Sequence, residues 1–363
     1  MQKIDVIIGG RSELIQAAAL RKASSGQEDI PDLRMIHTGE GMDPEFTPLL
    51  LEELSFRADE HLGIEGVSGA RLFAEVLVAY TDYLLLEKPD AVMLLGNSDS
   101  ATACALAAAR KGVEVIRIDA GNRHFDPKNS EEQNDGILDK LAHVLITSNS
   151  ESVINLMREG FDSEQIVELG NLRSDAVFHN LGHAEDSYAL ENHDLTMGAY
   201  ILVYAGFAGG KTPPATIISF FQLLESLSQQ VKVHMIIPPD TLQILEEYAE
   251  LDLESRTGFT IVSGHGYHDM LKLLKNAAIV LTDSQSIQEE TMILGVPCLT
   301  LGNTTNRPVT LAKGTNLLVG YEVSAIQSAI DSILEGNIRE AFPMDTWDGK
   351  VAPRIIEYLS KRD

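Results

Sequence analysis

The chain has 363 residues and a strongly acidic balance, with 28 Lys and Arg residues against 54 Asp and Glu residues and a net charge of −26. That length predicts two domains that each bury a core, and the 44% share of hydrophobic residues excludes a disordered protein. Nucleic acids and anionic membranes are excluded as partners because the charge would repel both, so we expect the acidity to serve a solvated surface.

The cellular compartment is predicted from the start of the chain and from its cysteines. No apolar run reaches the roughly 18 residues of a membrane helix, and the opening MQKIDVIIGG predicts a strand rather than a signal peptide. Cys104 and Cys298 stand in apolar sequences, which favours buried free thiols over a disulfide or a metal pair. A cytoplasmic protein is therefore expected.

Short apolar runs alternate with helical patterns along the whole chain. In the first half they predict strands at 4–8, 33–37, 91–95, 114–118, 144–147 and 166–169, with helices between them, for example at 12–24, 70–87 and 100–111. In the second half they predict strands at 200–204, 232–237, 260–262, 279–281 and 298–301. This alternation predicts the α/β class, with parallel sheets covered by helices on both faces.

A polar and acidic stretch at 179–198 is the best candidate for a linker. It separates two predicted Rossmann-like, doubly wound domains at 1–180 and 199–345, which are expected to face each other across a cleft, as in the GT-B architecture. Residues 346–363 predict a loop and an amphipathic helix. Ligands bind beyond the carboxyl ends of the strands in such sheets, so the loops after strands are where chemistry is expected.

The most informative part of the chain is the stretch from residue 281 to residue 320, together with the apolar run at 279–281 that leads into it. It reads as a buried strand, a turn at Thr282-Asp283-Ser284, a helix that carries Gln288-Glu289-Glu290, and a second strand. Backbone N–H groups at the start of such a helix can bind an anion. Either glutamate could accept hydrogen bonds from a sugar diol, so the stretch predicts a pocket for a nucleotide diphosphate.

The same region resembles the UDP-N-acetylglucosamine 2-epimerase family. The matching residues are Asp283-Ser284, Ile287-Gln288-Glu289-Glu290, Leu294-Gly295, Pro297, Thr304-Thr305, Arg307-Pro308, Gly314-Thr315 and Leu318-Val319-Gly320. The resemblance implies that the loop with Ser284, Gln285 and Ser286 binds the UDP phosphates, that Glu290 rather than Glu289 binds the ribose, and that Arg307 contacts the substrate. It also implies that the last helix crosses back to the first domain.

Further matches place other parts of the expected nucleotide site. Residues 9–15 resemble the family's GTRPEA-I loop, so Arg11 is expected to reach the diphosphate, the alternative being a surface arginine at a helix start. Tyr267 stands near the expected uracil, with ordinary packing as its alternative. Gly206 falls where relatives have a histidine, and Lys211 in the same glycine-rich loop would supply charge near the diphosphate.

The acid/base positions of the family are partly replaced in this chain. Asn97 stands where the family has an aspartate, and Asp99 either substitutes for it or caps the helix that begins at residue 100. Asp119 replaces a glutamate, and Arg123 follows in the same motif, as a substrate-binding residue. Glu131 and Glu132 match the family's PEE.NR text, while Asp135 replaces its arginine.

The family's reaction inverts C2 of a UDP-linked sugar. A base removes the C2 proton while UDP leaves C1, and UDP then adds back as a proton arrives on the opposite face, so acid/base groups are needed on both faces of the ring. Asn97, Asp99, Asp119 and Glu131 are the expected catalytic positions. No metal or redox cofactor is expected, and His265 and His268 lie without a metal-binding spacing.

Three functions are compatible with these residues. The first is a 2-epimerase acting on UDP-GlcNAc or a related UDP-HexNAc, which would make UDP-ManNAc for polysaccharide biosynthesis. The second is a hydrolysing or otherwise altered UDP-sugar enzyme, and the third is a non-catalytic nucleotide-sugar-binding paralogue. The resemblance also implies a homodimer through first-domain helices. Glu40 and Gly41 replace a Gln-His pair that helps bacterial relatives to bind an activating UDP-sugar, so that regulation is not expected.

Overall fold

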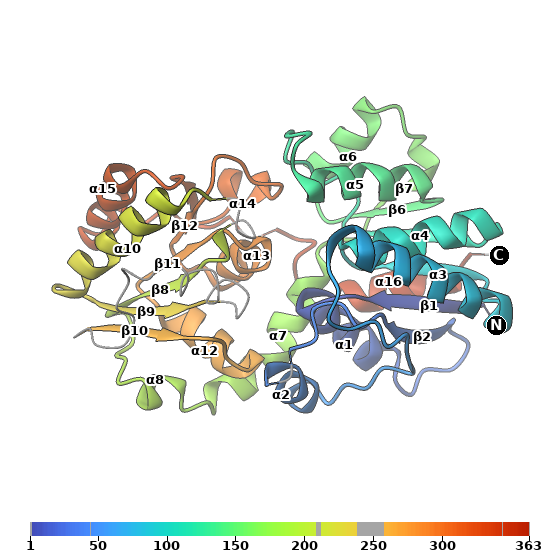
Figure 1. Cartoon of the computed structure of the whole chain (residues 1–363), viewed down its shortest axis with the longest axis horizontal. Coiled ribbons are helices and arrows are strands. Elements are labelled where there is room, and N and C mark those ends of the chain that lie inside the picture. Colours follow the sequence, from blue (N-terminus) through green and yellow to red (C-terminus); the bar gives the residue numbers. More distant parts are fainter. Residues whose placement is uncertain (1, 44, 208–211, 238–257, 343, 363) are drawn as a thin grey trace. The chain divides into compact units, whose positions relative to one another are not determined.

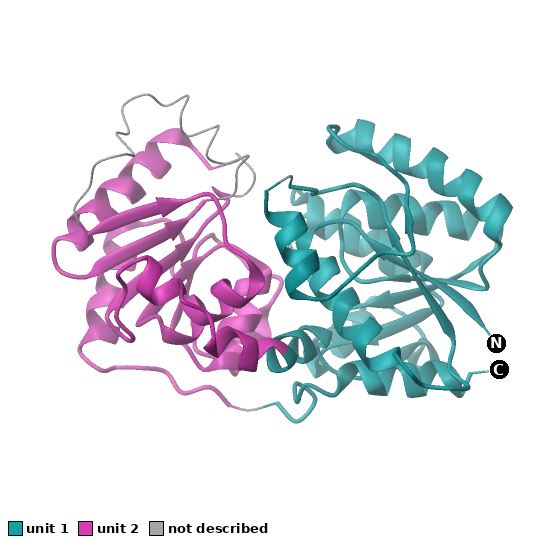
Figure 2. Ribbon diagram, turned by 90° about the horizontal axis from the view of Figure 1, so that it is seen from below, with its two compact units in different colours: residues 1–179, 344–363 teal, residues 180–343 magenta. Residues whose placement is uncertain are grey.

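The computed structural model describes residues 2–43, 45–207, 212–237, 258–342 and 344–362. The chain divides into two compact units (Figure 2). Unit 1 comprises residues 1–179 and 344–363, and unit 2 comprises residues 180–343. The C-terminal segment therefore belongs with unit 1. None of the described helices is both long and apolar enough to cross a membrane.

Unit 1 contains a sheet of seven parallel strands in the order β3-β2-β1-β4-β5-β6-β7 (Figure 1). Its strands are β1 (Lys3–Ile8), β2 (Asp32–His37), β3 (Glu60–His61), β4 (Ala91–Leu94), β5 (Glu114–Ile118), β6 (Val144–Thr147) and β7 (Ile166–Glu168). Its helices are α1 (Arg11–Ser24), α2 (Phe46–Glu53), α3 (Gly69–Glu87), α4 (Asp99–Lys111), α5 (Ser130–Leu141), α6 (Ser150–Arg158), the short η1 (Ser163–Gln165), α7 (Leu172–Glu185), which continues into unit 2, and α16 (Val351–Ser360).

Unit 2 contains a second parallel sheet of six strands in the order β10-β9-β8-β11-β12-β13. Its strands are β8 (Tyr200–Tyr204), β9 (Lys232–Ile236), β10 (Phe259–Val262), β11 (Ile279–Thr282), β12 (Cys298–Thr300) and β13 (Asn316–Leu318). Its described helices are α8 (Ala189–Asn192), α10 (Pro214–Ser228), α12 (Tyr267–Asn276), α13 (Gln285–Leu294), α14 (Pro308–Ala312) and α15 (Val323–Leu334).

Both sheets reverse their strand order at one point, between β1 and β4 in unit 1 and between β8 and β11 in unit 2. The central strands are buried on both faces, which explains why they read as continuous apolar runs rather than as alternating patterns. In a doubly wound sheet, ligands bind beyond the carboxyl ends of the strands at such a reversal. The loops after β1, β4, β8 and β11 are therefore the places to look for a site.

The C-terminal segment is tied to unit 1 by directed contacts. The Asp175 carboxylate accepts hydrogen bonds from the first two N–H groups of α16, those of Val351 and Ala352, each at 2.9 Å. The Trp347 indole donates to the Ser148 carbonyl at 2.8 Å. Gly170 has to lack a side chain, because a Cβ there would lie 1.9 Å from the carbonyl oxygen of Thr346.

The predicted α/β class with two doubly wound sheets is confirmed, and the predicted strands differ from the observed ones by a residue or so at their ends. The two short edge strands β3 and β13 were not predicted, because two or three residues carry no periodic signal. The stretch 179–198, the linker candidate, includes the division between the two units after residue 179, and much of it is helical. Helix α7 runs through the first part of it and α8 follows, because Ala184, Leu190 and Leu195 are buried. Cys104 and Cys298 are buried free thiols, as expected.

Candidate active site

The turn after β11 starts a helix whose N-terminus lies at the strand reversal of unit 2. Ser284 is the N-cap residue of α13, and its N–H donates to the Thr282 hydroxyl at 3.0 Å. Residues 283–286 are half-buried, while the helix behind them is buried. The first N–H groups of an α-helix have no acceptor within the helix, and they carry its positive dipole end. The turn with Ser284, Gln285 and Ser286 therefore has the construction of an anion site.

The loop after β8 is held beside this turn by Asp283. One carboxylate oxygen of Asp283 accepts from the Gly206 N–H at 2.9 Å, and the other accepts from the Tyr321 hydroxyl at 3.0 Å. Burial and the Asp283 charge raise the pKa of Tyr321, so this hydroxyl remains a donor. Asp283 thus joins the two loops at the reversal point. Lys211, which the sequence placed in the same loop as Gly206, lies outside the described residues.

The two adjacent glutamates of α13 are both buried but have different partners. The Glu289 carboxylate pairs with the Arg307 guanidinium, with 2.6 Å between Oε1 and Nε. An oxygen of Glu290 lies 3.4 Å from the Tyr267 hydroxyl. Because Arg307 already engages Glu289, Glu290 is the better candidate for a sugar diol, and a contact of Arg307 with substrate stays a prediction. Tyr267 is only 1% exposed, which favours the packing alternative for its ring.

In unit 1, the loop after β4 is linked to α5 by side-chain amides. The Asn97 amide donates to the Asp135 carboxylate at 3.0 Å. The Asn134 amide donates to the Asn97 carbonyl at 3.0 Å and to the Asp99 carboxylate at 3.1 Å. Ser98 is the N-cap of α4, so the alternative that Asp99 caps this helix is wrong, because the Ser98 hydroxyl already accepts from the Ala101 N–H.

Asp135 belongs to a row of buried charges behind this loop. Its carboxylate pairs with Arg117 of β5 at 2.9 Å, and Arg117 also lies 3.9 Å from Asp139. Arg123 pairs with Asp139 at 2.8 Å and with Glu159 at 2.7 Å. Burial raises the pKa of Asp139 to about 6, because desolvation outweighs the attraction of the two guanidinium groups.

Arg123 is held by partners of the chain itself. Its Nε and one terminal nitrogen donate to Glu159, its other terminal nitrogen donates to the Asn122 carbonyl, and the residue is 4% exposed. The guanidinium thus stabilises the turn after β5, and a contact of Arg123 with substrate stays a prediction. The motif match gave the residue type correctly, but it could not show where the side chain points.

Asp119 stands in this turn with a strained backbone. Its φ is 59°, in the left-handed region that costs a residue other than glycine about 1–3 kcal/mol. The Asn122 amide donates to the Asp119 carbonyl at 2.9 Å and helps to hold the turn. Strain of this kind, in a residue that follows a parallel strand at its carboxyl end, supports a functional role for Asp119.

The start of α5 brings Glu131 and Glu132 to a histidine that the sequence analysis missed. The imidazole Nε2 of His124 lies 3.1 Å from the Glu131 carboxylate. The Glu132 carboxylate accepts from the His124 N–H at 2.5 Å, so Glu132 orients this loop. The Glu131 side chain is 47% exposed, whereas that of His124 is 9% exposed. A histidine next to a motif arginine is a signal that could have been noticed, although sequence alone did not pair it with Glu131.

The loop after β1 carries Arg11 as the first residue of α1. Among the described residues, the Arg11 guanidinium makes no ion pair, and the residue is half-buried, so it can serve an anion. The Glu13 carboxylate accepts from the Gly10 N–H at 2.9 Å, and burial raises its pKa. Glu40 accepts from the Ser100 N–H at 3.1 Å, so a carboxylate of the chain itself already lies at the start of α4.

Two doubly wound parallel sheets, with loops and helix starts gathered at each strand reversal, define a nucleotide-binding α/β protein of the GT-B type. The chain belongs to the UDP-N-acetylglucosamine 2-epimerase family, whose family model matches residues 24–360.

Individual relatives agree with this membership. A UDP-N-acetylglucosamine 2-epimerase of Methanococcus maripaludis is 30% identical, with 98% of each chain covered. A UDP-2,3-diacetamido-2,3-dideoxy-D-glucuronate 2-epimerase of Pseudomonas aeruginosa is 29% identical, with 99% of each chain covered. The crystal structure of the Methanocaldococcus jannaschii UDP-GlcNAc 2-epimerase in complex with UDP-GlcNAc and UDP has a TM-score of 0.91 at 29% identity, with 99% of each chain covered.

Proposed function

We propose that this protein is a UDP-N-acetylglucosamine 2-epimerase, which interconverts UDP-GlcNAc and UDP-ManNAc by elimination and re-addition of UDP. The observation that carries the proposal is the turn after β11. There the half-buried Ser284, Gln285 and Ser286 start a helix, and Glu290 follows within the same helix while Glu289 is paired with Arg307. This combination suits a diphosphate on the helix start and a ribose diol on Glu290.

The acid/base groups are proposed on unit 1. Glu131 is half exposed and has His124 at hydrogen-bond distance, so the pair can take up or release a proton while the imidazole holds the carboxylate in place. Asp119, in its strained turn, is the second candidate. One group removes the C2 proton as the bond from C1 to UDP breaks, and another delivers a proton to the opposite face as UDP adds back.

Asn97 acts differently from the aspartate that the family pattern has at its place. A side-chain amide does not act as a general acid or base near neutral pH. The Asn97 NH2 group instead donates a hydrogen bond to Asp135. We propose that the Asp99 carboxylate takes the role of the missing aspartate. Asp99 lies close to Asn97, because the Asn134 amide donates both to the Asp99 carboxylate and to the Asn97 carbonyl. Asp135 is 2% exposed and paired with Arg117, so we assign it a structural role beside Asn97 rather than a catalytic one.

Proton NMR in D₂O tests the proposal directly. The protein is incubated with UDP-GlcNAc, and the C2 position is followed over time. We expect deuterium at C2 together with UDP-ManNAc, because elimination gives up the original proton to solvent. Free UDP with ManNAc would identify a hydrolysing enzyme, and UDP-GlcNAc that keeps its C2 proton, despite binding, would identify a non-catalytic paralogue.

We also propose a cytoplasmic homodimer that supplies UDP-ManNAc for polysaccharide biosynthesis. Helix α3 supports the dimer, because it exposes Val78, Leu85 and Leu86, which are 62%, 54% and 80% exposed. Val78 and Leu85 are two helical turns apart and lie on one face. Light scattering should give twice the mass of the chain for the wild type, and Leu86→Glu should shift the population toward the monomer.

A further inference from the structure

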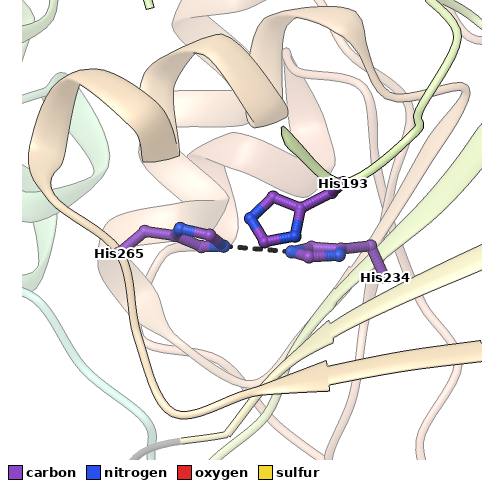
Figure 3. Close-up of side chains that lie close together, drawn as sticks. All are labelled: His193, His234 and His265. Atoms are coloured by element: carbon purple, nitrogen blue, oxygen red, sulfur yellow. Dashed lines mark hydrogen bonds between the residues drawn. The ribbon is translucent and has the colours of Figure 1, made fainter. Parts of the chain in front are cut away.

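Three histidines from distant parts of unit 2 gather on one face of its sheet. His193 follows α8, His234 lies in the middle of β9, and His265 lies in the loop before α12. Figure 3 shows the His193 ring beside the contact between the other two. The sequence analysis considered His265 only with His268, because nothing in the sequence shows that β9 and the end of α8 approach this loop.

The ring nitrogens converge on a common point. Nε2 of His234 and Nε2 of His265 are 3.0 Å apart, and each of the three residues offers a nitrogen within 4.8 Å of the others. The His193 ring centroid is 4.5 Å from that of His234 and 5.0 Å from that of His265. Tetrahedral Zn²⁺ with bonds of about 2.0–2.1 Å would separate its nitrogen ligands by roughly 3.3 Å. Small side-chain rotations would meet that distance.

Packing and hydrogen bonding alone explain this arrangement poorly. His234 is fully buried against the other two rings, and within the described part of the chain its Nδ1, on the side of the ring away from His265, has no hydrogen-bond partner. In the same part of the chain, the His193 imidazole makes no hydrogen bond, although it lies against both other rings.

We propose that His193, His234 and His265 form a binding site for a divalent transition metal of the zinc type. Three imidazole nitrogens are a known ligand set for Zn²⁺, with a fourth position left for water, and Mg²⁺ or Ca²⁺ would prefer oxygen ligands. The Asp269 carboxylate, which acts electrostatically on His193, adds a negative charge near the site.

A metal here would give a common centre to three segments that are already joined by the contact between His234 and His265 and by the ion pair between Lys232 and Asp194. It would fasten the end of α8 and the loop before α12 to the central part of β9. The loop that carries His265 continues through Gly266 into Tyr267, whose hydroxyl approaches Glu290. The metal site is therefore a structural one that stabilises unit 2, and it does not depend on the identity of the sugar.

Calorimetry with ZnCl₂ tests the site. Full-length protein without an affinity tag is treated with a chelator, and the chelator is then removed. The protein is titrated with Zn²⁺ in the presence of excess Mg²⁺, because Mg²⁺ occupies the acidic surface. We expect one Zn²⁺ per chain and a melting temperature that rises with Zn²⁺. Absence of zinc uptake by the wild type would overturn the proposal and would mean that the rings are held only by hydrogen bonding and stacking.

Two variants assign the binding to the three rings. His193→Ala removes a half-buried ligand from outside the sheet and should lower zinc affinity by more than about 100-fold, since loss of a mere supporting residue costs 10- to 100-fold. His183→Ala is the matched control, because His183 is exposed, stacks on His268 and is not one of the three clustered histidines. Unchanged affinity in His193→Ala, or an equal loss in both variants, would contradict the assignment. Circular dichroism of each variant verifies folding.

Discussion

The turn after β11 and the loop after β4 lie at the carboxyl ends of two similar parallel sheets, yet they differ in how they keep the family pattern. The first retains nearly every motif residue, from Asp283 to Glu290. The second has Asn97 in place of an aspartate, and Asp135 of α5, which contacts Asn97, stands in place of an arginine. A diphosphate is bound largely by backbone N–H groups, which depend on the path of the chain. Acid/base chemistry instead depends on individual side chains. One such side chain can be replaced by another if the side chains that contact it are replaced as well.

Two of the replaced positions in unit 1, Asn97 and Asp135, are neighbours in the structure. The Asn97 amide donates to Asp135, and Asp135 pairs with Arg117 from β5. A buried carboxylate next to a second carboxylate would be costly, whereas a carboxylate next to an amide donor and a guanidinium is satisfied. These two replaced positions therefore form one matched set, rather than separate losses of function.

The largest effect is expected for Glu131→Gln. It removes the proposed acid/base group and keeps its shape, so C2 exchange should fall by roughly 100- to 10,000-fold. UDP affinity should stay within about tenfold, because we propose that the nucleotide is bound by unit 2, whereas Glu131 belongs to unit 1. Exchange rates and calorimetry on the same sample measure both. Glu164→Gln, the same change at an exposed residue, is the control. Full activity in Glu131→Gln would show that the proton is handled elsewhere.

A smaller effect is expected for Asn97→Asp, which restores the residue type of the family pattern. The new carboxylate would face Asp135 with no proton donor between them, so we expect the free energy of unfolding to fall by about 3 kcal/mol. Urea unfolding measures this. Combining the change with Asp135→Asn puts an amide donor opposite the new carboxylate but takes the nearest carboxylate from Arg117, so it should recover only part of the stability. If Asn97→Asp alone were stable and more active than wild type, the matched set would be refuted.

The smallest effect is expected for Glu290→Ala. Loss of the diol contact should weaken UDP binding by about 1–3 kcal/mol, or roughly 5- to 150-fold. The free energy of unfolding of the ligand-free protein should change little. A titration that compares UDP with 2′,3′-dideoxy-UDP checks the cause, since the variant should lose the preference for the ribose hydroxyls. An unchanged affinity would remove Glu290 from the site.

Much of this could be predicted from the sequence, and the failures have physical reasons. Continuous apolar runs predicted the buried strands, and the ordered motifs from Asp283 to Gly320 predicted the turn after β11. Motif identity does not fix side-chain direction, so the pairing of Arg123 with Asp139 and Glu159 was not predicted. The contact between His124 and Glu131 depends on loop conformation, and the three clustered histidines depend on the order of strands in the sheet.

Every proposed step requires unit 2 to hold UDP, so the decisive measurement is a calorimetric titration of UDP into the wild-type chain. We expect saturable binding of one UDP per chain, weakened in Glu290→Ala and retained in Glu131→Gln. No measurable binding of UDP or UDP-GlcNAc at millimolar concentration would contradict it.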